Sequence, residues 1–323
     1  MLTGATGFLG GVLVRRLLAT GLAPEQLRCV VRDVERAQKG GLPAACLVAG
    51  DLSDPSCIPQ LRRAADGAEV VVHLAGSLKA YDRRGFDDVN VHGTQRLVEA
   101  VQHVATGSHF VHVSSLAAAG PSVDGRGSAD PAEQCRSVSN YGESKRQGEL
   151  LVTKSDLPFT ILRPPVVYGP NDAATRLLFR QARSLVTAVP IQPRPLSVIH
   201  ADDVAEALWQ AVLQRPSGAT LPLTGPELTD THAFLRAIAS ACGKKARLLP
   251  IPMALATVAA SVCDGWARLV RRPGFFNRDK VREIRAVGWV ADGQPAQRIL
   301  GFQAATQLDD GLAAVAASEG PVI

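Results

Sequence analysis

The chain of 323 residues lacks the features that mark several classes of protein. Its six cysteines form no CxxC pair and have no spacing typical of a metal site or a disulfide framework, so we expect no metal and a reducing compartment. No charged-then-apolar leader opens the chain, because a glycine-rich motif begins at Gly4. Internal repeats and low-complexity tracts are absent as well. These absences predict a folded cytoplasmic protein.

Net charge and aromatic content are also small. The formal net charge is +5, and aromatic residues make up 5% of the chain. Basic residues nevertheless gather late in the sequence, in a cluster formed by Arg268, Arg271, Arg272, Arg278, Lys280, Arg282 and Arg285. A nucleic-acid surface usually adds aromatic residues and a recognisable module, and neither accompanies this cluster. We therefore expect no nucleic-acid partner and favour a solvated or anion-facing helix.

An apolar stretch at residues 248–262 lies just before this basic cluster. It is too short to span a bilayer and is followed by Asp264. The pattern is compatible with a pocket lid, with an interfacial helix that makes weak membrane-surface contact, or with core packing. Of the three, the sequence favours core packing.

The first half of the chain alternates short β-branched runs with amphipathic stretches, as at 29–31, 70–74 and 110–113. This alternation predicts a doubly wound parallel sheet with helices on both faces, which is the Rossmann type of α/β fold. We assign residues 1–165 and 196–218 to this domain. The Pro-punctuated segments 166–195 and 219–323 are predicted to form a smaller lobe that shapes a substrate pocket.

The motif Thr3-Gly-Ala-Thr-Gly-Phe-Leu-Gly10 leads into a helical run, so its glycines lie on a strand-to-helix turn. In such a turn Gly4 permits the tight bend, Gly7 lets backbone amides approach a pyrophosphate, and Gly10 lets the helix pack on the sheet. The pattern predicts dinucleotide binding. Only Met1 and Leu2 precede the motif, so either the true start lies upstream or the central strand is short.

Two further residues bear on the cofactor. Arg32 ends the second predicted strand, where an NAD-specific enzyme usually carries an acidic residue, and an arginine there suits a 2′-phosphate. The alternative is a solvent-facing arginine beside Asp33. We therefore favour NADP over NAD. Asp51 either lies at the adenine edge or caps a turn.

Tyr141 and Lys145 stand four residues apart on a predicted helix and share one face. A tyrosine is a poor proton shuttle at neutral pH unless a neighbouring ammonium stabilises its phenolate, and Lys145 supplies that charge. Ser115 follows the strand at 110–113 and would hydrogen-bond a substrate carbonyl, with Ser114 as its rival. The three side chains predict hydride transfer at a ketone or secondary alcohol, with Tyr141 as the acid or base.

The chain resembles extended short-chain dehydrogenases/reductases of the epimerase/dehydratase group over nearly its whole length. The matching pieces are TGATGFLG at 3–10, GDLS at 50–53, HLAG at 73–76, NVHGT at 90–94, SS at 114–115, YGESK at 141–145, RPPVVYGP at 163–170 and HADD at 200–203. The resemblance implies that residues 74–76 line the cofactor, that residues 164–167 pass the nicotinamide and that Lys145 binds its ribose. The predicted cofactor contacts are Gly4, Thr6, Gly7, Phe8, Leu9, Gly10, Arg32, Asp51, Leu52, Leu74, Ala75, Gly76, Tyr141, Lys145, Pro164 and Val167. Among proteins that resemble this chain, a homodimer formed through two helices is common.

Departures from the group narrow the expected activity. Leu116 and Ala117 stand where the group's sugar-nucleotide dehydratases carry Asp and Glu, which argues against dehydration. Residues 196–197 replace an Arg-Asp pair that is usual in the epimerases. The rest of the chain resembles the 3β-hydroxysteroid dehydrogenase and dihydroflavonol reductase branch of the group. We expect an NAD(P)-dependent oxidoreductase acting on a fairly apolar small molecule. The alternatives are a nucleotide-sugar epimerase with retained NAD and a non-catalytic NADP-binding protein.

Overall fold

The computed structural model describes residues 1–184, 186–270, 274 and 276–318. Its centre is a seven-stranded sheet in the order β10-β6-β5-β4-β1-β2-β3, with every neighbouring pair parallel. The strands are β1 (Leu2–Thr3), β2 (Cys29–Val31), β3 (Leu47–Ala49), β4 (Val70–His73), β5 (His109–Val113), β6 (Phe159–Arg163) and β10 (Ala219–Pro222). The predicted Rossmann-type sheet is confirmed.

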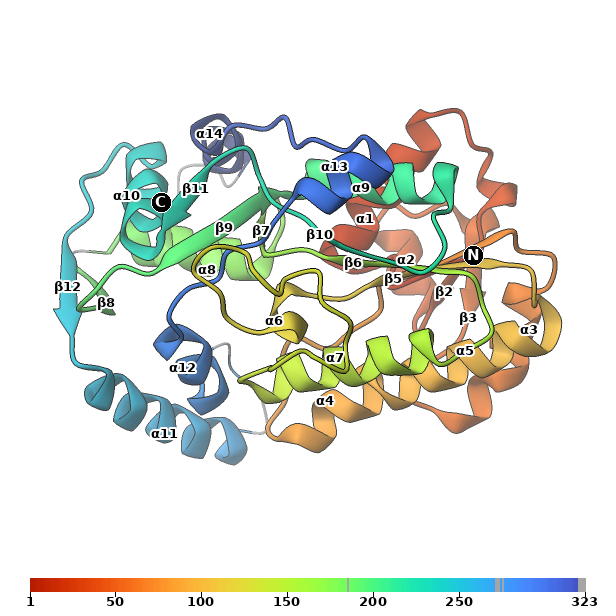
Figure 1. The fold of residues 1–323 in the computed structure, drawn as a ribbon, viewed down its shortest axis with the longest axis horizontal. Coiled ribbons are helices and arrows are strands. Elements are labelled where there is room, and N and C mark those ends of the chain that lie inside the picture. The colour runs from red at the N-terminus through yellow and green to blue at the C-terminus, as the bar shows by residue number, and fades with distance from the viewer. Residues whose placement is uncertain (185, 271–273, 275, 319–323) are drawn as a thin grey trace.

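Helices cover both faces of this sheet (Figure 1). On one face α1 (Phe8–Ala19) packs against α9 (Ala201–Gln214), with α13 (Gln294–Leu300) beside it. On the other face α3 (Ile58–Ala65), α5 (His92–Val104) and α7 (Asn140–Thr153) pack side by side. The remaining helices of this half are α2 (Val34–Lys39), α4 (Arg83–Asn90) and α6 (Leu116–Ala119). Each face buries its own apolar cluster, and both clusters rest on residues of the strands.

A second group of elements surrounds a smaller core of Tyr168, Phe179, Phe234 and Leu312. Its strands are β7 (Val166–Tyr168), β8 (Thr187–Pro190), β9 (Pro195–His200), β11 (Leu228–Asp230) and β12 (Leu248–Ile251), and its helices are α8 (Ala173–Ala182), α10 (Thr231–Ala241), α11 (Met253–Leu269), α12 (Arg278–Arg285) and α14 (Leu308–Ser318). One predicted boundary needs correction: β10, at 219–222, pairs with β6 and is the seventh strand of the large sheet. The division into two lobes itself stays a prediction.

The central strand of the sheet is short. β1 has two residues, both buried, yet it pairs with β2 on one side and β4 on the other. The strand order reverses at this strand, and ligands of open α/β sheets bind at such a switch point, beyond the carboxyl ends of the strands. Gly4 follows β1 directly and therefore lies at that edge.

A buried ion pair ties the sheet to α7. The guanidinium of Arg163, at the end of β6, donates to both carboxylate oxygens of Glu149 at 2.9 and 2.6 Å, and neither side chain is exposed. The same guanidinium donates to the carbonyls of Ser128 and Asp130, at 2.8 Å each. Breaking a buried pair by removing one partner costs about 3–5 kcal/mol, so this contact fixes the loop after β5 against α7 and β6.

The apolar stretch at 248–262 does not form one element. Its start is β12, and its remainder opens the longer helix α11, which continues past Asp264. The expectation of core packing is wrong for its large side chains, since Leu255, Val258 and Val262 are exposed. Among the residues with described positions, no helix has both the length and the apolar character needed to cross a membrane. Arg271 and Arg272 of the basic cluster lie outside the described residues.

Candidate active site

The glycine-rich turn between β1 and α1 is shaped for a close backbone approach. Gly4 has φ +80°, and a Cβ there would lie 2.6 Å from the amide nitrogen of Ala75. A Cβ on Gly10 would lie 2.0 Å from the carbonyl oxygen of Gly4, so neither position accepts a side chain. The N-cap of α1 is Gly7, which supplies no side-chain cap, and the first turn of the helix has no acidic residue. Its free N–H groups fit the pyrophosphate of a dinucleotide.

The other predicted cofactor residues follow successive strands of the same edge. Arg32 comes directly after β2 and is exposed, while the carboxylate of Asp33 accepts a hydrogen bond from the Arg36 amide and caps α2. Asp51 closes a turn after β3 by accepting from the amide and hydroxyl of Ser53, at 2.9 and 2.7 Å. The rest are distributed along the edge: Thr6, Phe8 and Leu9 around the start of α1, Leu52 after β3, Leu74, Ala75 and Gly76 after β4, Pro164 after β6 and Val167 in β7.

The predicted residues thus run along the whole edge, from those beside β2 and β3, through the turns after β1 and β4, to those beside β5 and β6. Strands β2 and β5 are three places apart in the sheet, which corresponds to roughly 14 Å. An extended dinucleotide lying across β1 would reach from Arg32 to Ser115. This arrangement fits a cofactor whose adenine and nicotinamide ends lie on opposite sides of the switch point.

Ser115 and Tyr141 are brought together by two helix starts. Ser115 is the N-cap of α6, and its hydroxyl accepts from the Ala117 amide at 3.2 Å. Tyr141 is the second residue of α7 and is half-buried. Burial raises the pKa of Tyr141 to about 12, while a hydrogen bond with Ser115 acts to lower it. The rival Ser114 is buried, and its hydroxyl has no hydrogen-bond partner among the described residues.

Lys145 lies one helical turn beyond Tyr141 and is buried. Its ammonium donates to the carbonyl of Val113 at 2.8 Å, at the end of β5. Burial lowers the pKa of Lys145 to about 8, and the charge of Glu149 acts to raise it. A Cβ on Gly76 would lie 3.8 Å from the ammonium, so the loop after β4 passes directly over it. The ammonium is therefore held between the ends of β4 and β5, where the resemblance places the nicotinamide ribose.

Asn90 is a site residue to which the sequence analysis gave no role. Its side chain donates to Ser144 of α7 at 2.8 Å and exchanges two hydrogen bonds with the backbone of Ser77. Asn90 is 1% exposed and so holds the loop after Gly76 against the turn of α7 that carries Lys145. The sequence did carry a signal for Asn90, because the NVHGT motif at 90–94 begins at this asparagine.

Two carboxylates of α12, those of Asp279 and Glu283, also had no role in the sequence-based predictions. Asp279 accepts from the amides of Asn140 and Tyr141, at 2.7 and 3.2 Å, and Glu283 accepts from the hydroxyl of Ser139 at 2.7 Å. Negative charge at a helix N-terminus is stabilising, so α12 fixes the start of α7 and with it the tyrosine. The charge of Glu283 also raises the pKa of Tyr141. About 140 residues separate these partners, so no local motif could have revealed them.

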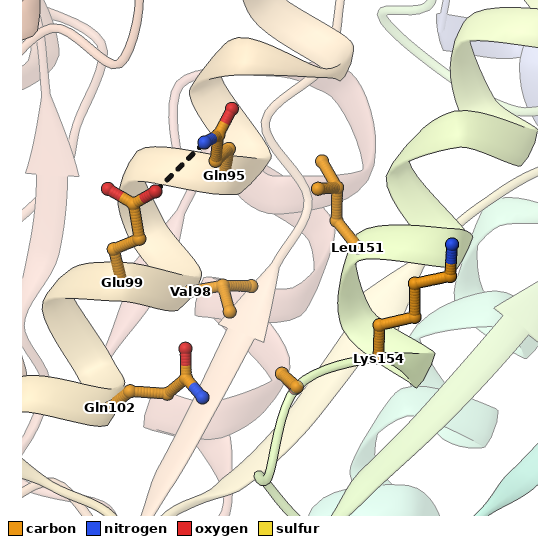
Figure 2. Close-up of a pocket in the computed structure, with 7 residues that line it drawn as sticks. Gln95, Val98, Glu99, Gln102, Leu151 and Lys154 are labelled. Atoms are coloured by element: carbon orange, nitrogen blue, oxygen red, sulfur yellow. Dashed lines mark hydrogen bonds between the residues drawn. The ribbon is translucent and has the colours of Figure 1, made fainter.

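A surface groove between α5 and α7 lies away from Ser115, Tyr141 and Lys145 (Figure 2). It is lined by Gln95, Val98, Glu99, Gln102, Leu151, Lys154 and Ser155. Leu151 is ten residues from Tyr141 on the same helix, a separation of about 15 Å along the axis. None of the predicted site residues lines the groove, so we place the candidate active site at the sheet edge and not here.

Comparison with known proteins agrees with this geometry. A model of the NAD dependent epimerase/dehydratase family matches residues 1–221. A ceramide reductase from Caulobacter vibrioides is 36% identical over 303 residues, which cover 91% of this chain and 86% of that protein. A 4-hydroxy-2-methyl-3-oxo-4-farnesyl-3,4-dihydroquinoline-1-oxide ketoreductase from Stigmatella aurantiaca is 29% identical over 280 residues, covering 83% and 80%.

Among solved structures, the UDP-glucose 4-epimerase of Thermus thermophilus in complex with NAD superimposes with a TM-score of 0.74. The match covers 99% of both chains at 21% identity, a likeness of fold alone. The family match spans the glycine-rich turn, Ser115, Tyr141 and Lys145. The chain therefore belongs to the NAD-dependent epimerase/dehydratase family, as an NAD(P)-dependent enzyme of the extended short-chain dehydrogenase/reductase type.

Proposed function

We propose that this chain is an NADPH-dependent reductase that converts a ketone of an apolar, lipid-like substrate into a secondary alcohol. The observation that carries the proposal is the hydrogen bond between Ser115 and a half-buried, protonated Tyr141 at the carboxyl edge of the sheet. A tyrosine whose pKa is about 12 holds its proton at neutral pH, so the proton is in place for the alkoxide oxygen that forms on reduction. That protonation state suits reduction.

Each residue of the site then has a separate task. The bound nicotinamide supplies the hydride. Ser115 donates a hydrogen bond to the substrate carbonyl, and Tyr141 delivers its proton to the same oxygen as the carbon is reduced. Lys145 is one turn away, and its charge favours the phenolate that remains on Tyr141 until solvent returns a proton. A non-catalytic binding protein would not need these three groups in place.

The apolar substrate class is supported by the relatives. The ceramide reductase and the farnesyl-quinoline ketoreductase are both named for substrates with long hydrocarbon parts. We propose a ketone of ceramide-like character for this chain. NADP is preferred because Arg32 is exposed at the end of β2 and its neighbour Asp33 is engaged as a helix cap. The homodimer and the cytoplasmic location stay predictions.

We predict that Tyr141→Phe lowers turnover about 10²- to 10⁴-fold, because only the proton-donating hydroxyl is removed. Affinity for NADPH, measured by isothermal titration, should change little. Ser115→Ala should also lower turnover, and Ser114→Ala is the matched control, expected to resemble the wild type. Wild-type turnover in the phenylalanine variant would place the chemistry elsewhere, and a larger loss in Ser114→Ala would transfer the carbonyl contact to that serine.

The pH profile of ketone reduction follows from Lys145. With a pKa of about 8, its ammonium loses its proton as the pH rises through that value. Since Tyr141 keeps its proton until a much higher pH, we expect kcat/KM to be level below about 8 and to fall above it. Steady-state kinetics across this range test the profile. A rate that instead climbs as the pH passes that value would mean that Tyr141 must ionise first, which contradicts its role as acid.

Cofactor choice should depend on Arg32. We expect the wild type to bind NADPH more tightly than NADH, and Arg32→Asp to lose roughly 10- to 100-fold in NADPH affinity, because a charge-assisted contact is replaced by repulsion. Arg63→Asp is the matched control, since Arg63 is an exposed arginine on α3 that is not among the predicted cofactor contacts. Titration calorimetry measures both affinities. Equal or tighter NADH binding by the wild type would refute the preference.

A further inference from the structure

The outer face of α11 is a continuous stripe of large apolar side chains. Leu255, Val258, Val262, Trp266 and Leu269 are each between 60% and 74% exposed. Their spacing of three, four, four and three residues places all of them on one side of the helix. Soluble proteins rarely expose a contiguous apolar patch of this kind unless it binds something. We call these five residues the α11 stripe.

The buried face of the same helix is made of small residues. Ala256 and Ala260 are the buried residues of α11, and Asp264 pairs with Arg278 of α12 at 3.0 Å. An ordinary surface helix does the reverse, with large apolar residues inside and polar ones outside. The exposed stripe is therefore not a by-product of loose packing. The helix is seated through alanines and presents its large apolar residues to the outside.

The surface beside the stripe is cationic. In α12, Arg278, Lys280 and Arg282 are 53–58% exposed, and they pair with the less exposed carboxylates of Asp264, Glu283 and Asp279 at 3.0, 2.7 and 3.3 Å. Asp279 and Glu283 are turned toward the start of α7, which they cap. The cationic side chains of α12 are therefore the ones that face outward. Arg268 and Arg285 add two more exposed cations, and no ion pair of theirs is found within the described residues.

We propose that the α11 stripe and the cations of α12 dock this protein on an anionic lipid bilayer. An interfacial helix buries Leu and Trp at the acyl boundary while Lys and Arg meet anionic headgroups, which is the chemistry of this surface. A second copy is the weaker occupant, because a self-complementary contact through the stripe would bring two cationic rims together. α11 lies along the surface of the molecule next to α12 (Figure 1).

The docking surface adjoins the active site through α12. The helix packs on α11 on one side and caps the helix of Tyr141 on the other, through Asp279 and Glu283. A membrane under α11 would therefore lie close to the catalytic tyrosine. If the proposed function holds, a lipid ketone could pass from the bilayer to the site without crossing water. The docking proposal itself does not depend on that function.

Vesicle flotation tests the docking. Purified full-length protein is floated at low salt with vesicles of equimolar phosphatidylcholine and phosphatidylglycerol, or of phosphatidylcholine alone. We expect co-flotation with the anionic vesicles, reduced at high salt. The triple variant Val258→Ser, Val262→Ser, Trp266→Ser should lose at least about ten-fold in binding. The matched control Val123→Ser, Leu213→Ser, Leu228→Ser removes three apolar residues of similar exposure elsewhere and should float like the wild type.

A second pair of measurements separates charge from folding. The variant Arg268→Gln, Arg285→Gln should weaken anionic binding by roughly five-fold for each cation removed. Vesicles should shift the tryptophan emission to the blue in the wild type but not in Trp266→Ser. Circular dichroism, thermal midpoint and NADPH affinity check that every variant is folded.

The outcomes are distinct. No wild-type flotation at low salt, or equal flotation of the stripe variant, would overturn the docking. A dimer in sedimentation that is lost in the stripe variant, without vesicle binding, would assign the surface to a second copy and also overturn it. Flotation by a protein that reduces no ketone would leave the docking standing and refute the proposed function instead.

Discussion

The burial of the Lys145 ammonium is the constraint on which the rest of the site depends. The charge is removed from water, and of its three N–H donors one is used by the Val113 carbonyl within the described structure. Burial lowers its pKa from 10.5 to about 8, so the charged form destabilises the folded state below about pH 8, and this penalty fades as the pH rises toward 10.5. Strongly perturbed, buried ionisable groups gather at functional sites, which supports the role proposed for Lys145 beside Tyr141.

The surroundings of Lys145 are organised to hold this charge in position. A buried hydrogen-bond chain runs from Thr3 through His73 and Thr94 to Asn90, and on to Ser144, the neighbour of Lys145. It connects the strand before the glycine-rich turn to α7. Burial lowers the pKa of His73 to about 3, so the chain stays neutral beside the ammonium. From the opposite side, α12 caps the start of α7. Hydrogen bonds thus connect the strand before the glycine-rich turn, α7 and α12.

Local patterns in the sequence were sufficient to predict the sheet, and they named candidate residues that the structure distributes along its carboxyl edge. β-branched runs predicted β2, β4 and β5, and the motifs after each strand predicted an edge where Gly4, Ser115 and Lys145 would meet, because parallel strands end on one side of a sheet. Contacts between distant segments were not predictable in this way. The Asp279 cap lies some 140 residues from its target, and β10 joins the sheet by pairing with β6. The exposure of α11 was misjudged because an apolar run does not reveal which of its faces a neighbour covers.

The central claim is that this enzyme reduces a ketone with a nicotinamide cofactor that binds and dissociates in each cycle. It does not epimerise a substrate with a cofactor that stays bound. A reductase must release its oxidised nucleotide every cycle, whereas an epimerase returns the hydride to the same substrate and gains by keeping the nucleotide. The most direct measurement is to denature the purified protein, identify any released nucleotide, and in parallel count NADPH consumed against alcohol formed from a long-chain ketone. The account predicts little bound nucleotide and one NADPH oxidised per alcohol. Stoichiometric bound NAD, with sugar-nucleotide epimerisation and no net NADPH oxidation, would contradict it.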